Sequence, residues 1–283
     1  MDFVVFVAGL LALGLASVHD IRTREVPDLV SYGLLLFSVS YGAAKALLLG
    51  SWQPLLSMLL GLGAMVALGF LLFYLGQWGG ADSKLLMGLG ALLGLGFGSY
   101  DLLLFLVLSL FSGATYGLLY TAGLAFKERK AFVERFRRII REPRIHTLRT
   151  VVVTCCFLLL FAAVLAATYR PALIVATIAV YLMFYLWLSV KAVEQAVLIK
   201  EYPVGKLTEG DWILKDVMVR GKRVCGPKDL GISEEQIAEL KRLKVKKVWV
   251  KEGIPFVPSF LVAYVLLWLL SPLAAPLMAA LFP

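Results

Sequence analysis

The chain has 283 residues, of which 60% are apolar and 17% are charged, whereas soluble domains have roughly 45–50% apolar and about 25% charged residues. The apolar residues are gathered in long uncharged blocks, which excludes a soluble globular protein and indicates a chain that crosses a membrane several times. The formal net charge of +9 would suit nucleic acid, but the distribution of the basic residues gives it another meaning.

Cysteine and histidine are too scarce for several kinds of site. Cys155, Cys156 and Cys225 cannot form a disulfide framework or a four-cysteine zinc site. His19 and His146 are too few and too far apart in the sequence for a metal cluster. We therefore expect no metal ion and no cofactor. The absence of Asn and the scarcity of Gln are a bias reported for thermophilic proteins.

Eight apolar blocks are the predicted membrane-spanning helices. They fall at 3–19, 29–50, 54–76, 85–99, 102–125, 150–168, 171–190 and 256–270. Most have the roughly 17–25 residues that a spanning helix needs. Block 85–99 is short and reaches a spanning length only if its helix begins near Asp82. The predicted fold class is an all-α polytopic membrane protein with about eight transmembrane helices.

Lysine and arginine indicate the orientation of these helices. Four segments hold 26 of the 28 basic residues: 20–28, 77–84, 126–149 and 191–253. With eight spans and the N-terminus outside, all four segments face the cytoplasm, as the positive-inside rule requires. The net charge thus reports membrane topology. The sequence predicts a multi-pass protein of the cell membrane and no nucleic-acid partner.

Two of the cytoplasmic segments are long enough to fold. In 126–149, Phe132, Phe136, Ile139 and Ile140 have helical spacing among basic residues, which predicts an amphipathic helix on the anionic inner leaflet of the bilayer. Residues 193–254 differ in composition, and we expect a small cytoplasmic α+β domain there. Its predicted strands are 212–219, 222–225 and 245–251. The run from Ser233 to Gln236 is a capping box that opens a helix ending near Leu243.

The chain thus divides into five predicted domains. They are a membrane core (1–125), a basic amphipathic loop (126–149), a transmembrane helix pair (150–192), the α+β domain (193–254) and a C-terminal transmembrane helix (255–283).

Two acidic residues lie at helix ends on the same predicted face of the membrane. Asp20 ends the first predicted helix, and Asp82 begins the fourth. A pair of carboxyl groups from different helices is the arrangement of an aspartic protease, because one activates water as a base while the other donates a proton. The structural alternatives are a helix N-cap for Asp82 and a solvated loop acid for Asp20.

The residues around each aspartate give more detail. Small residues at Gly79, Gly80 and Ala81 would let another backbone approach the Asp82 carboxylate closely. Lys84, two residues further on, is able to point at the lipid headgroups.

The segment after Asp20 has its own markers. Arg22 and Arg24 mark the membrane interface, and Pro27 resets the chain before the second helix.

Both motifs resemble a known family. Residues 20–27, DIRTREVP, resemble the first-aspartate motif of the type IV prepilin peptidase family, and 79–85, GGADSKL, are similar to its GxGD motif. The resemblance covers residues 3–125 and implies catalytic roles for Asp20 and Asp82. Ala81 replaces the second glycine of the strict motif, as in archaeal members. Residues 253–258 also resemble the archaeal preflagellin and prepilin peptidases.

The resemblance implies a membrane aspartic endopeptidase without a cofactor. It would cut the basic leader, or class III signal peptide, from prepilin-like and preflagellin precursors at the cytoplasmic boundary of the membrane. The cysteine-rich insert of the bacterial enzymes is missing, so we expect no methyltransferase activity. Two alternatives are an ion-coupled transporter that uses Asp20 and Asp82, and a non-enzymatic assembly protein that docks partners through 193–254.

Two further matches are interpreted as coincidence. Tyr100-Asp101 and Pro171-Ala172-Leu173 resemble elements of presenilin-type proteases. In those proteases the tyrosine–aspartate element precedes GxGD, whereas here it follows. The predicted topology also places both on the outer face, away from Asp82, so we interpret Asp101 as a turn residue.

Overall fold

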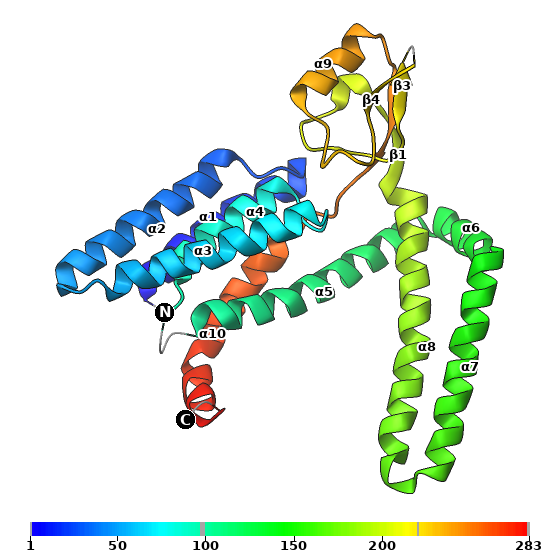
Figure 1. The fold of residues 1–283 in the computed structure, drawn as a ribbon, viewed down its shortest axis with the longest axis horizontal. Helices are drawn as coiled ribbons and strands as arrows, with labels where there is room; N and C mark the ends of the chain where they lie inside the picture. The colour runs from blue at the N-terminus through cyan, green and yellow to red at the C-terminus, as the bar shows by residue number, and fades with distance from the viewer. Residues whose placement is uncertain (1, 97–99, 220, 282–283) are drawn as a thin grey trace. The chain divides into compact units, whose positions relative to one another are not determined.

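A computed structural model describes residues 2–96, 100–219 and 221–281, and the chain is largely helical (Figure 1). The α-helices are α1 Phe3–Thr23, α2 Asp28–Leu49, α3 Gln53–Tyr74, α4 Gly80–Leu93, α5 Asp101–Lys127, α6 Arg129–Ile140, α7 Pro143–Leu165, α8 Arg170–Val193, α9 Glu234–Arg242 and α10 Val257–Leu281. Within the described ranges, six helical segments are long and apolar enough to cross a membrane, namely α1, α2, α3, α5, α7 and Ala167–Leu198. The predicted fold class is confirmed, while the count of eight spans stays a prediction.

The chain divides into two compact units. The first comprises residues 1–117, 204–246 and 253–283, and the second comprises 118–203 and 247–252. The five-domain division predicted from the sequence stays a prediction.

Helix α4 lies in the core of the first unit, packed between α2 and α3. Glycines make this packing close. A Cβ atom on Gly88 would lie 3.2 Å from the Leu34 side chain, and one on Gly90 would lie 2.6 Å from the carbonyl oxygen of Gly61. Small residues at such contacts let helix backbones approach each other where lipid supplies no hydrophobic driving force.

Helix α10 packs along α1 in the same unit. The Tyr264 hydroxyl of α10 donates a hydrogen bond of 2.7 Å to the Val5 carbonyl of α1. The Phe6 ring stacks on Trp268 with 4.3 Å between the ring centroids. This packing brings the start of α10 next to the end of α1, although Thr23 and Val257 lie far apart in the sequence.

Helix α4 is shorter than the spanning helix predicted from block 85–99. It begins at Gly80, close to the expected start near Asp82, but ends at Leu93 after 14 residues, or about 21 Å at about 1.5 Å per residue. Gly94 takes the left-handed region with φ of 68°, and the Leu95 N–H donates to the Ser57 carbonyl of α3 at 2.8 Å. The apolar pattern continues past Leu93, but the backbone turns away, and residues 97–99 lie outside the described part.

The second unit contains a hairpin of two apolar helices, α7 and α8, that lie side by side (Figure 1). A short 3₁₀ turn, Ala167–Tyr169, joins them, and a π-helical turn, Glu194–Leu198, continues α8. Strands β1 (Ile199–Pro203) and β5 (Lys247–Lys251) pair antiparallel, with Glu201 opposite Trp249. The predicted alternation in β5 is confirmed, since Val248 and Val250 are buried while its other residues are exposed.

The predicted amphipathic helix is present as α6, but its apolar face has a protein partner. Phe132, Phe136 and Ile140 pack around the buried Ile139 in a cluster that includes residues of α7 and α8, among them Leu188. This face therefore contacts neighbouring helices of the same unit, where the sequence predicted contact with lipid. Both environments select the same residue types, so the pattern alone could not separate them.

The remaining strands and α9 belong to the first unit. One predicted strand, 212–219, is two short strands, β2 (Trp212–Ile213) and β3 (Val217–Val219), while β4 is Lys222–Cys225 as predicted. The chain bends between β2 and β3, where the Asp216 carboxylate accepts a hydrogen bond of 2.7 Å from Nε of Arg223. Strands β3 and β4 pair antiparallel.

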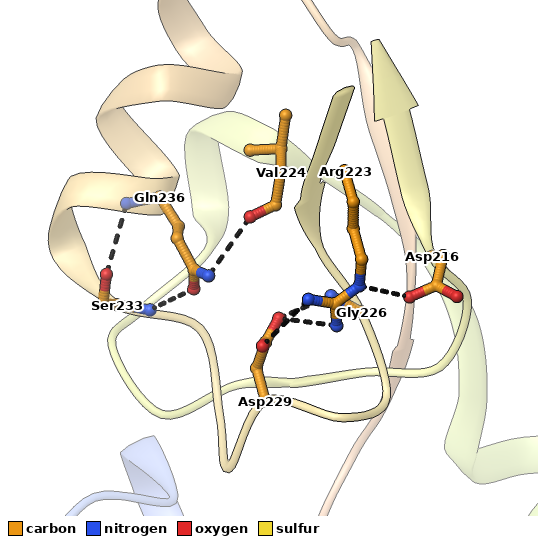
Figure 2. A network of polar contacts seen from close by, with 7 residues as sticks. All are labelled: Asp216, Arg223, Val224, Gly226, Asp229, Ser233 and Gln236. Atoms are coloured by element: carbon orange, nitrogen blue, oxygen red, sulfur yellow. Dashed lines mark hydrogen bonds and ion pairs between the residues drawn. The ribbon is translucent and has the colours of Figure 1, made fainter. Parts of the chain in front are cut away.

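A polar network holds this small fold together (Figure 2). The Arg223 guanidinium also donates to both carboxylate oxygens of Asp229, at 3.2 and 3.0 Å. The predicted capping box is confirmed: the Gln236 N–H donates to Ser233 Oγ at 3.3 Å, and the Ser233 N–H donates to the Gln236 side-chain oxygen at 3.0 Å. Gln236 also donates to the Val224 carbonyl at 3.2 Å, which ties α9 to β4.

Candidate active site

Asp20 lies on the buried face of α1, one turn before the helix ends, and is 6% exposed. Its Oδ2 accepts a hydrogen bond of 2.9 Å from the backbone N–H of Val257, the first residue of α10. The first N–H groups of a helix have no partner within the helix and carry a partial positive charge, so they bind carboxylates well. The start of α10 thus holds this carboxyl group in place.

Arg24 connects the same two helices. Its φ of 60° is left-handed and ends α1, with its N–H bonded to the Asp20 carbonyl at 2.9 Å. Its guanidinium donates to the Gly253 carbonyl at 2.7 Å, four residues before Val257. Sequence reasoning interpreted Arg24 and Arg22 only as interface markers. Both arginines are exposed, and Arg24 fastens the segment whose N–H group contacts Asp20.

Asp82 is the third residue of α4 and lies in its first turn. Its Oδ2 accepts a hydrogen bond of 3.3 Å from the Gly79 N–H. This contact is a capping interaction, so the structural role considered as an alternative is present. It does not use up the carboxyl group, which has four lone-pair sites when ionised.

The glycines before Asp82 are not tightly packed. A Cβ atom on Gly79 would meet Asp82 Oδ2 at 3.6 Å, and one on Gly80 would meet the Phe73 ring at 3.8 Å, both ordinary contact distances. The close approach of another backbone, expected from the sequence, is absent at these two glycines among the described residues. Ala81 packs at the edge of the hydrophobic core.

The fold brings the two aspartates together. They come from different helices, α1 and α4, and the negative charge of Asp20 acts on the Asp82 carboxyl group across the core of the first unit. Two carboxyl groups that interact in this way do not ionise together easily and can share one proton. A pair with one proton can supply an acid and a base at once.

The sequence suggested that Lys84 is able to point at lipid headgroups, but its ammonium group has a partner within the protein. Its ammonium group forms an ion pair of 2.7 Å with Asp28, the first residue of α2, and lies 5.4 Å from the centroid of the Tyr32 ring. Pro27 immediately precedes α2. The pair fastens the first turn of α4 beside the first turn of α2, although partly exposed pairs of this kind add little stability.

Asp101 lies elsewhere in the first unit. It starts α5 and lines a pocket with Asp2, Tyr41 and Lys45, at the end of α1 opposite to Asp20. The interpretation that Asp101 is separate from the Asp82 site therefore agrees with its position. Within residues 2–96, 100–219 and 221–281, no group of three His, Cys, Asp or Glu side chains could hold a metal ion.

Sequence reasoning missed the role of the α10 start and of Asp28. The signal for α10 was available, because Pro255 and Pro258 bracket a helix start after a basic segment. Nothing in the sequence indicated that this start lies against Asp20, since the contact joins residues 237 positions apart.

Residues 7–118 match the type IV leader peptidase family. The chain is 34% identical to a preflagellin peptidase of Methanococcus voltae over 83 residues, which are 29% of this chain and 35% of that protein. It is 34% identical to a preflagellin peptidase of Methanocaldococcus jannaschii over 81 residues, 29% of this chain and 34% of that protein.

These matches cover only part of each protein, since the chain spans about a third of the length of the curated relatives that it matches. No solved structure matches the chain. The matched residues 7–118 include both Asp20 and Asp82. The comparisons confirm, for this region, the resemblance to the type IV prepilin peptidase family and to its preflagellin peptidases that the two aspartate motifs predicted.

Proposed function

We propose that this protein is a membrane aspartic endopeptidase that removes the basic leader from preflagellin-like and prepilin-like precursors. The relatives it resembles are preflagellin peptidases, and the match includes both aspartates. The observation that carries the proposal is the pairing of Asp20 and Asp82, from two helices, at a distance where one charge acts on the other.

The pair would hydrolyse a peptide bond without a cofactor. The ionised carboxylate takes a proton from water as the oxygen of that water bonds to the peptide carbonyl carbon. The protonated carboxyl group donates its proton to the carbonyl oxygen. As the C–N bond breaks, the leaving amine takes the proton that the first carboxylate had accepted from water, and a hydroxyl group of the tetrahedral intermediate returns a proton to the second carboxylate. The Val257 and Gly79 N–H groups hold the two carboxyl groups in position during these transfers.

The charge distribution supports a cytoplasmic position for this chemistry. Both aspartates lie in or next to the segments 20–28 and 77–84, two of the four that hold 26 of the 28 basic residues. A precursor whose basic leader stays in the cytoplasm and whose apolar helix enters the membrane would present their junction at this level. The positive residues would also favour an anionic inner leaflet as the lipid partner.

Three single variants test this function. Asp20→Asn and Asp82→Asn should each abolish cleavage of a precursor with a class III leader, because Asn neither accepts a proton as a base nor donates one as an acid at neutral pH. Asp101→Asn is the matched control and should cleave at the normal rate. Cleavage is followed by gel mobility after co-expression, with membrane insertion checked for each variant. An active Asp20→Asn protein would overturn the proposal.

The double variant tests whether the two groups act as a unit. Removing both carboxylates should be no worse than removing either one, a non-additivity that is expected when two groups serve one step. An ion-coupled transporter or a docking protein would show no cleavage with any variant, including the unaltered protein.

A further inference from the structure

Two buried hydroxyl groups of the first unit have no hydrogen-bond partner among the described protein groups. They belong to Ser17 in α1 and Ser31 in α2, which are 4% and 1% exposed. Leaving a buried polar group unsatisfied lowers stability, and most buried polar groups in folded proteins are bonded. Two such groups in one small core therefore require an explanation.

Two other buried hydroxyls in this protein are bonded within their own helices. Ser38 donates to the Leu34 carbonyl at 2.7 Å, and Thr177 donates to the Leu173 carbonyl at 2.8 Å. This bond to the preceding turn is the usual one for Ser and Thr within a helix. Ser17 and Ser31 have carbonyls at the same offset but form no such bond, so their hydroxyls are available to a group outside their own helices.

Ser17 lies next to the first aspartate. It precedes Asp20 by three residues on the same buried face of α1, which corresponds to about 4.5 Å along the helix axis. Residues three apart on a helix are surface neighbours. The Ser17 hydroxyl therefore lies about one turn closer to the N-terminus of α1 than the Asp20 carboxyl group, deeper in the helical core of the first unit.

Ser31 is related to the second aspartate through Asp28 and Lys84. It follows Asp28 by three residues, and Asp28 is fixed beside Lys84, two residues after Asp82, by the ion pair of 2.7 Å. Further along the same two helices, Gly88 of α4 contacts Leu34 of α2, so they run in the same direction. Ser31 thus also lies about one turn further into the core than the aspartate pair.

The precursor segment around the cleaved bond would need hydrogen-bond partners at this depth. A peptide bond is attacked only when its carbonyl is exposed, so the precursor helix must unwind around that bond. The freed backbone N–H and C=O groups then lack water within the membrane. A hydroxyl group both donates and accepts hydrogen bonds, so one serine can bond to either kind of backbone group.

We propose that Ser17 and Ser31 are positioning residues that bind the unwound backbone of the precursor on the carboxyl side of the cleaved bond. The carboxyl side is assigned because the apolar helix of the precursor follows the leader and occupies the deeper part of the membrane. This inference rests on the proposed function and deepens it.

The test compares removal of an unpaired hydroxyl with removal of a paired one. Ser17→Ala and Ser31→Ala should each lower kcat/KM for a synthetic precursor, with a basic leader and an apolar helix, by about 2- to 12-fold, the equivalent of one ordinary hydrogen bond. The loss should appear as a higher KM with kcat little changed, as expected when binding is weakened uniformly. The Tm of each variant should stay equal or rise, because an unsatisfied polar group has been removed.

Ser38→Ala is the matched control, since Ser38 is also buried in α2 but bonds within the protein. It should show the opposite pattern, a lower Tm and a normal KM. If kcat, KM and Tm are all unchanged in Ser17→Ala and Ser31→Ala, the proposal is overturned. A loss of Tm equal to that of Ser38→Ala, which would indicate a purely structural bond, would also overturn it.

The same measurements separate a role in catalysis from a role in substrate binding, and failure of this inference from failure of the proposed function. A loss confined to kcat, with KM unchanged, would assign the hydroxyls to the catalytic water and would overturn their assignment to the substrate backbone. Failure of this inference leaves the proposed function intact as long as Asp20→Asn and Asp82→Asn are inactive. Failure of the proposed function is recognised separately, by cleavage that persists in those two variants.

Discussion

Two pairs of acidic residues in the first unit are held in opposite ways. In the small α+β fold, Arg223 lies between Asp216 and Asp229 and donates to both, so each negative charge faces a positive one. In the helical core, the charge of Asp20 acts on Asp82, so one carboxyl group faces another. The first arrangement stabilises a fold. The second costs stability, and like-charge pairs of this kind are common at active sites.

Two arginines show the same contrast. Arg223 neutralises carboxylates directly, whereas Arg24 donates to the Gly253 carbonyl and so fastens the start of α10 near Asp20. Removing Arg223 should therefore alter stability, and removing Arg24 should alter cleavage.

The largest expected effect is that of Arg24→Ala. Without its bond to Gly253, the Val257 N–H group should no longer hold the Asp20 carboxyl group, and small misplacements of catalytic groups lower rates by about 10- to 100-fold. The measurement is kcat for precursor cleavage by purified protein. Arg22→Ala is the matched control, because Arg22 is an equally exposed arginine of the same motif, and its rate should be normal. Equal rates for the two variants would contradict the positioning role of Arg24.

A smaller effect is expected from Arg223→Ala. Loss of its partly exposed charged hydrogen bonds should destabilise the α+β fold. The buried Cys225 thiol next to Arg223 reports on this opening, and maleimide labelling should become about 5- to 30-fold faster in a Cys155→Ser, Cys156→Ser background. Cleavage should stay within twofold. Lys222→Ala, which removes an exposed ion pair with Glu239, should leave the labelling rate unchanged.

The smallest effect concerns pH. Burial, helped by the nearby Asp229 charge, raises the pKa of the Cys225 thiol from 9.0 to about 11. The folded state therefore keeps its thiol proton at pH values where the unfolded chain loses it. The contribution of this thiol to the stability of the α+β fold should be constant below about pH 9. It should be lost as the pH rises from 9 towards 11. Thermal unfolding from pH 8 to 11 measures it, and Cys225→Ala should lack this component of the decrease.

Much of the architecture followed from the sequence. Long apolar blocks predicted the spanning helices, the run from Ser233 to Gln236 predicted α9, and alternation predicted β5. Two short motifs identified the aspartates that the fold brings together. Each of these signals is local, because it depends on residues within a few turns of one another.

The features that the sequence did not reveal depend on distant contacts. The end of α4 is set by a bond between Leu95 and Ser57, although the apolar pattern continues. The apolar face of α6 packs on helices where lipid was expected, and both environments select the same side chains. The contact between Asp20 and Val257 crosses nearly the whole chain, so neither motif contains it.

The contact between Gly61 and Gly90 has a consequence for how this protein can change over generations. A methyl group on either residue would collide with the backbone of the facing helix, which cannot move aside as a flexible side chain does. Neither position touches the aspartates, yet both should accept almost no substitution in a library selected for cleavage. The exposed faces of α2 and α3 should drift freely among apolar residues. The narrowest evolutionary freedom in the membrane core would thus belong to residues that have no side chain at all.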